Sequence, residues 1–517
     1  MHKMSNIQHR RSGFSRVGPK INLLVWILTF GVFMMTLTLT SRLSFVVAGV
    51  LALNFALMMF SLCFLYRHRL LLSPAAIFLV TCIPFYTFGN IGDLTGRESW
   101  ILSHQGALEN YSIVAILSSI GLIVYLWSLA RFNKMTRVTG VRGAILQDSL
   151  EVPELLRRCV SFKSIACTST TAILLLSYLS WNYSFVGGYF IDVNSQFDKY
   201  LAGTMYSFIF LAALLSIAGI CRGKGPLRLL SIIVVGMSLV LVVMMRSRST
   251  MGFLVVCMLG VAFTVLPLSM KYLNRIVVTG VVLLVVLLGV GTVVKDAQRA
   301  IGLKEASSSL MGNLGSVVTV STQDAARLFI SRVAVEGPSR MAGFEFPASL
   351  LMAFDNGGEP MYGKALVSAA IAFLPAMLRP EGIYSERHAI GEFYRPYGFI
   401  YNDMPGMVLS TGLAEAGIWG VIPVFILFAY WHSLLWRLVC RSQLLFLAYL
   451  AHIPALIRMD LLWDSIFLSL RVGVVMVIAL YCLAPLMRRL AKKQRRVRPF
   501  NSPIRSDLQL RTDRPSG

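Results

Sequence analysis

The distribution of hydrophobic residues along the chain is dominated by long apolar runs that short polar segments separate. Twelve of these runs approach the roughly 20 residues that an α-helix needs to cross the hydrocarbon core of a bilayer. They lie at 21–40, 43–66, 71–90, 110–130, 164–181, 203–221, 228–245, 251–269, 276–294, 406–436, 442–457 and 465–486. The pattern predicts an all-α, polytopic integral membrane protein with about 12 transmembrane helices.

One polar excursion, residues 295–405, is far longer than any other segment between predicted spans. Within it, Ser321 to Val335 has the periodicity of an amphipathic helix, and residues 363–378 form a short apolar run that ends among prolines. We interpret the run as a re-entrant or interfacial helix, because a thirteenth span would place the two basic termini on opposite sides of the membrane.

The basic charge gives these spans a direction. The chain has 48 Lys and Arg against 24 Asp and Glu, and most of the excess lies in the two tails and in alternate short loops, which is typical of cytoplasmic segments. The predicted division is a cytoplasmic N-terminus at 1–20, transmembrane helices 1–9 at 21–294, a large loop on the outer side at 295–405, transmembrane helices 10–12 at 406–486, and a cytoplasmic tail at 487–517. This distribution favours an anionic lipid bilayer as the partner and argues against nucleic acid.

The cysteines argue against a disulfide scaffold. All eight fall in predicted spans or inner segments, and no Cys/His spacing resembles a zinc site. We therefore expect no metal and no cofactor.

Arginines recur at the predicted outer face. The guanidinium stays charged and presents paired donors, so it suits bidentate binding of phosphate. The candidates for a diphosphate-binding site are Arg246, Arg248, Arg379, Arg387, Arg395, Arg458 and Arg471. The alternative is that they reach lipid phosphates or pair with the acidic residues Glu386, Glu392, Asp460 and Asp464.

Three residues are candidates for proton transfer. Glu415 lies inside a predicted span, where an unpaired carboxylate is costly, so it needs an arginine or an aqueous cavity. Asp403 precedes that span and suits a helix N-cap as well as it suits a base. His388 is the only histidine of the large loop, and a lone loop histidine is often structural or simply exposed.

Four features occur together between residues 240 and 470: Ser247-Arg248 at the start of a span, the large outer loop, the segment from Pro375 to Pro380, and Glu415-Ala-Gly-Ile-Trp-Gly420. In this combination the chain resembles the O-antigen polymerase (Wzy-type) family of oligosaccharide repeat unit polymerases, which are related to the O-antigen ligases. Ala376 stands where the family element commonly has arginine, and Arg379 is placed to take over its role. Tyr401-Asn402 stands where the ligases often carry His-Asn, which favours a polymerase.

The resemblance implies a GT-C-like glycosyltransferase of the bacterial inner membrane that makes O-antigen or exopolysaccharide. It would transfer a growing glycan from undecaprenyl diphosphate to a lipid-linked repeat unit at the periplasmic face, without a metal. The arginines would stabilise the diphosphate, and Glu415, Asp403 or His388 would accept the proton of the acceptor hydroxyl. A flippase and a chain-length regulator are the implied partners. The alternatives are a lipid-linked oligosaccharide flippase or transporter, which usually shows repeated halves, and an O-antigen ligase.

Overall fold

The computed structural model describes most of the predicted helices. The described residues are 30–35, 45–67, 70–83, 86–87, 107–138, 144–183, 185–186, 189–190, 195–244, 248–266, 279, 344–374, 386–399, 407–457 and 461–497. The predicted spans 21–40 and 276–294 and the predicted helix from Ser321 to Val335 lie wholly or mostly outside these residues.

Within the described part of the chain, six helices are long and apolar enough to cross a membrane. They cover Phe45–Leu65, Glu109–Phe132, Phe162–Asn182, Tyr200–Arg222, Val408–Val439 and Leu462–Leu483. The only strands described are a two-residue antiparallel pair, β1 (Phe185–Val186) and β2 (Tyr189–Phe190). By the length and composition of its helices the chain is an α-helical, multi-pass membrane protein, as the apolar pattern predicted.

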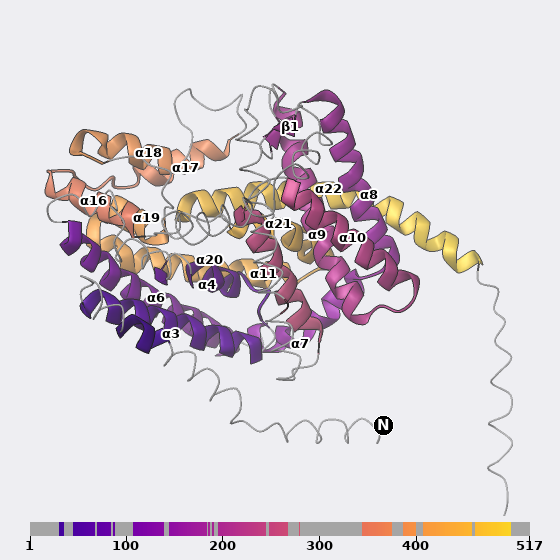
Figure 1. The fold of residues 1–517 in the computed structure, drawn as a ribbon, viewed down its shortest axis with the longest axis horizontal. Coiled ribbons are helices and arrows are strands. Elements are labelled where there is room, and N and C mark those ends of the chain that lie inside the picture. Colours follow the sequence, from indigo (N-terminus) through magenta and orange to yellow (C-terminus); the bar gives the residue numbers. More distant parts are fainter. Residues whose placement is uncertain are drawn as a thin grey trace, which may run out of the picture.

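The first half of the chain contributes two groups of helices (Figure 1). Their bounds are α3 (Phe45–Arg67), α4 (Pro74–Ile83), α6 (Ala107–Val138), α7 (Ala144–Cys159), α8 (Phe162–Asn182), α9 (Gln196–Arg222), α10 (Pro226–Met244) and α11 (Arg248–Val265). Helix α3 packs against α4 and α6, and α9 packs against α8, α10 and α11.

The second half joins these groups and adds the short helices of the large loop. Its elements are α16 (Glu345–Asp355), α17 (Lys364–Phe373), α18 (Glu386–Tyr394), the 3-10 turn η4 (Arg395–Tyr397), α19 (Val408–Ala416), the 3-10 turn η5 (Gly417–Gly420), α20 (Val421–Val439), α21 (Gln443–Ile457) and α22 (Leu462–Val497). Helix α20 packs against α6 and α4, while α21 packs against α22 and α9. Helices α16 to α19 gather at the left-hand end of Figure 1.

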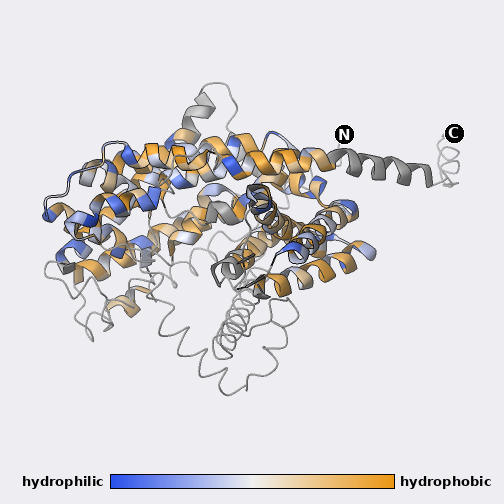
Figure 2. Cartoon of the chain, turned by 90° about the horizontal axis from the view of Figure 1, so that it is seen from above, coloured by the Kyte–Doolittle hydropathy of each residue, from blue (hydrophilic) through white to orange (hydrophobic). Residues whose placement is uncertain are grey.

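The helix surfaces are apolar where a soluble protein would be polar. Figure 2 shows hydrophobic residues along the outside of the long helices, and Phe60, Trp127 and Trp181 are each more than half exposed. A soluble monomer rarely exposes an apolar area of this extent, whereas lipid tails solvate it readily.

Small and polar residues join the helices inside the bundle. The Asn54 amide of α3 donates to the hydroxyl of Ser118 at 2.9 Å and accepts from Ser119 of α6 at 2.7 Å. A Cβ on Gly121 would lie 2.3 Å from the ring of Phe425, so α6 and α20 approach closely only because residue 121 is glycine. Such contacts replace the hydrophobic effect, which is weak between helices in lipid.

One segment differs in part from the prediction. The predicted span 406–436 is present as the membrane-crossing stretch Val408–Val439, but it is not one continuous helix, because Gly417 adopts φ 61° and ψ −151° and η5 separates α19 from α20. The segment between the predicted spans 110–130 and 164–181 contains a helix, α7, with Pro153 inside it. The predicted short apolar helix at 363–378 is present as α17, which at 10 residues is too short to span a bilayer.

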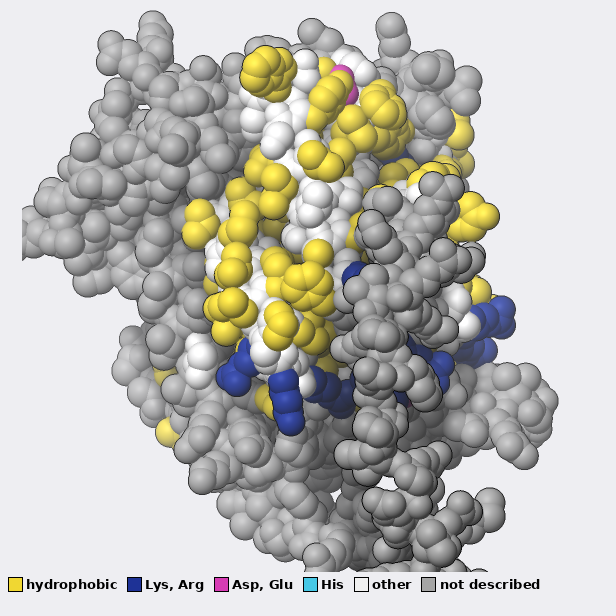
Figure 3. All heavy atoms as spheres, turned by 90° about the vertical axis from the view of Figure 1, so that its right-hand side faces the viewer, with side chains coloured by type: hydrophobic (Ala, Val, Ile, Leu, Met, Phe, Trp, Pro, Cys, Tyr) yellow, Lys and Arg dark blue, Asp and Glu magenta, His cyan; other side chains and the backbone are white. Residues whose placement is uncertain are grey.

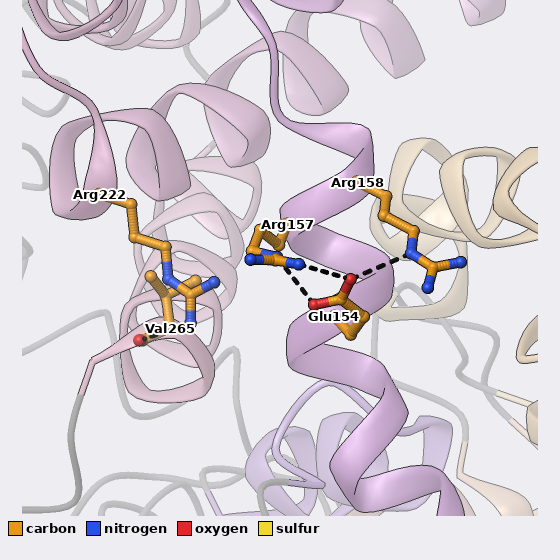
Figure 4. Close-up of polar contacts among 5 residues, drawn as sticks. All are labelled: Glu154, Arg157, Arg158, Arg222 and Val265. Atoms are coloured by element: carbon orange, nitrogen blue, oxygen red, sulfur yellow. Dashed lines mark hydrogen bonds and ion pairs between the residues drawn. The ribbon is translucent and has the colours of Figure 1, made fainter. Parts of the chain in front are cut away.

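Exposed basic residues collect where α7, α9 and α10 meet. They are Arg157, Arg158, Arg222, Lys224 and Arg228. Figure 3 shows Lys and Arg side chains along the lower edge of a hydrophobic face on this side of the molecule. Figure 4 shows that the only acid drawn there, Glu154, bonds both Arg157 and Arg158, and these bonds lower the pKa of its carboxyl, with Arg157 the larger cause. Arg222 reaches across to the carbonyl of Val265 at 3.3 Å, joining α9 to α11.

Candidate functional site

The first element of the site is a buried carboxyl group, Glu386, at the start of α18. Its Oε2 accepts the backbone N–H groups of Trp463 at 2.9 Å and Asp464 at 3.0 Å, so it caps the N-terminus of α22. Asp464 Oδ1 in turn accepts the N–H of Glu386 at 3.0 Å. The two carboxyl groups therefore cap each other's helices and fix α18 to the beginning of α22.

Thr411 brings α19 into the same network. Its hydroxyl donates to Glu386 Oε1 at 2.6 Å and accepts the N–H of Leu462 at 3.0 Å. Thr411 and Glu386 have no exposed surface. Both hydrogen-bonding functions of the hydroxyl are used, so three helices that are separated in sequence meet at one point.

Glu415 caps a different helix from its position near the end of α19. Its Oε2 accepts the N–H of Gly363, and its Oε1 accepts the N–H of Leu366 at 2.9 Å and the indole N–H of Trp463 at 3.1 Å. Glu415 thus holds the N-terminus of α17. It also contacts the side chain of Trp463, whose backbone N–H donates to Glu386. The sequence required a partner for this carboxylate, and the partners are N–H groups.

Burial shifts the pKa of two groups in the site. Desolvation, and then the nearby Asp464, raise the pKa of Glu386 to about 8, despite the hydrogen bonds that stabilise its charged form. Burial also raises the pKa of Tyr394, whose hydroxyl donates to the carbonyls of Glu359 at 3.0 Å and Ala414 at 3.1 Å.

The predicted basic residues of α18 lie beside this network. Arg387 and His388 follow Glu386 directly and are half-buried, and the guanidinium carbon of Arg387 is 5.9 Å from the ring centre of Phe346 in α16. Arg395 is exposed and pairs with Glu392 at 2.6 Å, as the ion-pair alternative expected. The N-terminal half of α18 thus carries an acid, an arginine and a histidine in succession.

Two further predicted arginines lie on long helices. Arg471 is half-buried seven residues after Asp464 in α22, and its guanidinium carbon is 4.7 Å from the ring centre of Tyr200 in α9. Such cation–π contacts stabilise a cation within an apolar helix. Arg248 begins α11, whose last residue, Val265, is joined to Arg222 at the opposite end. The remaining predicted residues, Asp403, Arg246, Arg379 and Arg458, lie outside the described residues.

Three residues in the site were not singled out from the sequence. Thr411 and Trp463 supply the links described above, and Lys364, the first residue of α17, is exposed with its ammonium 4.7 Å from the ring centre of Phe393. A detectable signal was the pair Trp463-Asp464 at the start of an apolar run, since acids in the first turn are typical of helix starts. Within the described residues, no group of three or more His, Cys, Asp or Glu side chains could hold a metal ion.

No family model, curated protein or solved structure matches the chain. The function is therefore inferred from the geometry of the site and from the sequence motifs.

Proposed function

We propose that the chain is a glycosyltransferase of the bacterial inner membrane that polymerises lipid-linked glycan repeat units. In this proposal the fold is GT-C-like, the chain crosses the membrane twelve times, both termini are cytoplasmic, and the large loop faces the periplasm. The observation that carries the proposal is the gathering of α16 to α19, with η4, at one end of the bundle, where Lys364 and Arg395 are exposed and Arg387 and His388 are half-buried.

The chemistry needs little more than binding and electrostatics. Undecaprenyl diphosphate is a good leaving group, so the protein mainly has to align two lipid-linked substrates and stabilise charge on the diphosphate. In the proposed mechanism Arg248, Arg387 and Arg471 hold the diphosphate, because arginine can bind two phosphate oxygens at once.

The geometry distinguishes the candidates for the base. The Glu415 carboxylate already accepts hydrogen bonds from three N–H groups, two at the start of α17 and one on the indole of Trp463. Protonation of Glu415 would weaken these hydrogen bonds. His388 is half-buried on the helix that Glu386 anchors, next to Arg387. We therefore assign Glu415 chiefly to positioning α17. Among the residues that the structure describes, we favour His388 as the group that accepts the proton of the sugar hydroxyl.

The test is the length distribution of the glycan, read on a gel from cells that carry Arg248→Ala, His388→Ala or Glu415→Gln. We expect each variant to lose the long ladder and leave glycan with a single repeat unit, because export and ligation need only one unit. Glu392→Gln, which removes an exposed ion pair, is the matched control and keeps the ladder. Membrane levels of every variant are measured alongside.

Other outcomes would replace the proposal. Loss of all surface glycan, with the variant present at normal levels, would indicate a flippase or a ligase. An unchanged ladder in all three variants would show that the site lies elsewhere.

A further inference from the structure

An apolar cavity of about 250 Å³ lies far from the proposed site, between α3, α4, α6 and α20. Its lining is almost entirely hydrocarbon or aromatic and includes Phe64, Leu79, Leu129 and Trp436. His432 contributes a polar wall, but its Nδ1 is 2.7 Å from the hydroxyl of Tyr125 and that group is already paired. An apolar cavity with few polar groups does not favour water and accepts a hydrophobic guest.

The cavity lies in the leaflet away from α16 to α19. Helix α6 begins beside α16, where the Asn110 amide donates to Asp355 at 3.0 Å, and its lining residues start at Leu126. Sixteen residues of α-helix span about 24 Å, most of the roughly 30 Å thickness of the hydrocarbon core. The lining residues of α20 are likewise in its last turns, with Trp436 among them.

The cavity borders the lipid-facing surface of the bundle. Phe60 and Phe64 of α3 line it and are 66% and 52% exposed, and Ala130 of α6 lines it and is exposed. Leu79 and Trp436 line it and have almost no exposed surface. A hydrocarbon chain can therefore pass from the bilayer to the buried wall without crossing water.

A cation follows the lining residues of α6 in the sequence. Arg131 follows Ala130 directly, is exposed, and has its guanidinium carbon 5.6 Å from the ring centre of Trp127. Among the residues that the structure describes, Arg131 has no ion pair with an acid. Arginine and tryptophan together are typical of the interface between lipid tails and headgroups, where anionic lipid is attracted.

We propose that the cavity binds one acyl chain of an anionic phospholipid from this leaflet, whose phosphate contacts Arg131. The lipid would fill the space between α3, α4, α6 and α20 and act as a resident component of the bundle. This site is independent of the proposed glycan chemistry and of the outer arginines.

Photo-crosslinking tests the acyl-chain part. The full chain is reconstituted in bilayers that contain phosphatidylglycerol with a diazirine in the acyl chain, and adducts are located by mass spectrometry of peptides. We expect adducts on Leu79 or Trp436, which surrounding lipid cannot reach. Ala130→Trp at the rim should reduce those adducts several-fold and leave adducts on the lipid-facing Leu229 unchanged. Adducts confined to Phe60 and Phe64 in the unaltered protein would overturn the proposal, and that result requires no variant.

A second probe tests the headgroup part. The same diazirine chain on phosphatidylcholine should label the buried wall several-fold less than phosphatidylglycerol does. Arg131→Gln should abolish the difference, whereas Arg228→Gln, which alters an exposed arginine of α10, should retain it. Equal labelling by the two lipids in the unaltered protein would refute recognition of an anionic headgroup.

Discussion

Single carboxyl groups organise the end of the bundle where α16 to α19 gather. Glu386 and Glu415 are acids in a chain of which only 14% of the residues are charged, and each is stabilised by N–H groups at the start of a helix. The partial positive charge of a helix N-terminus and its unpaired N–H groups make it a suitable partner for a carboxylate. The expected arginine partners are therefore unnecessary for these two acids.

Glu386→Gln should change how stability depends on pH. In the unfolded chain this carboxyl loses its proton near pH 4.5, but in the folded chain only near pH 8. The folded state binds the proton more tightly, so the contribution of Glu386 to stability is complete below pH 4.5 and declines as the pH rises towards 8. Glutamine stays neutral, so the melting temperature of Glu386→Gln should fall less over this range than that of the unaltered protein.

The measurement is the melting temperature in detergent at several pH values between 4 and 9. Glu392→Gln alters an exposed acid of the same helix and should follow the unaltered protein. Parallel curves for Glu386→Gln and the unaltered protein would show that the Glu386 carboxyl is already charged at neutral pH.

At the scale of elements, the break between α19 and α20 decides where the acids lie. Gly417 occupies a region of φ and ψ that essentially only glycine adopts, and it turns the chain into η5. A Cβ on Gly420 would lie 2.0 Å from the carbonyl oxygen of Gly412, so α19 packs directly on η5 through backbone atoms. As a result, Thr411 contacts the first residue of α22 and Glu415 contacts the start of α17.

Gly417→Ala should destabilise the protein by about 1–3 kcal/mol, because the required backbone conformation is strained for any residue with a Cβ. Gly473→Ala is the control: residue 473 lies within α22, and a Cβ there meets nothing within 4 Å. Alanine favours helix by up to about 1 kcal/mol over glycine, so the control should be neutral or slightly stabilising. Equal melting temperatures for the two variants in detergent would contradict the assigned conformation of Gly417.

At the scale of the whole molecule, the two ends of the bundle differ in their balance of exposed charged residues. Arg157, Arg222 and Lys224 are exposed where α7, α9 and α10 meet, whereas α18 lies in the group of short helices at the left of Figure 1. Basic residues are retained on the cytoplasmic side of a membrane. The proposed orientation therefore places α7 inside and α18 outside.

Cysteine labelling measures this orientation. In intact cells with a permeabilised outer membrane, a membrane-impermeant maleimide should label Glu392→Cys, and it should label Arg157→Cys only after the inner membrane is opened. Both positions have exposed side chains, and the parent chain, whose Cys482 is exposed, supplies the background. Labelling of Arg157→Cys before Glu392→Cys would invert the proposed topology.

The sequence by itself determined the class of the protein, since runs such as 43–66 and 203–221 need only be long and apolar to be stable as helices in lipid. It also located the short helix α17 and marked Glu415 as a carboxylate that requires partners. These are local properties of composition and length.

The tertiary structure decided which partners those residues have. The reciprocal caps of Glu386 and Asp464 join positions 78 residues apart, and Trp463 reaches Glu415 across 48 residues. The cavity beside Phe64 and Trp436 depends on four helices at once. Periodicity reports only which face of one helix is apolar, so contacts between distant helices, and the break at Gly417 that directs them, follow from how the whole chain packs.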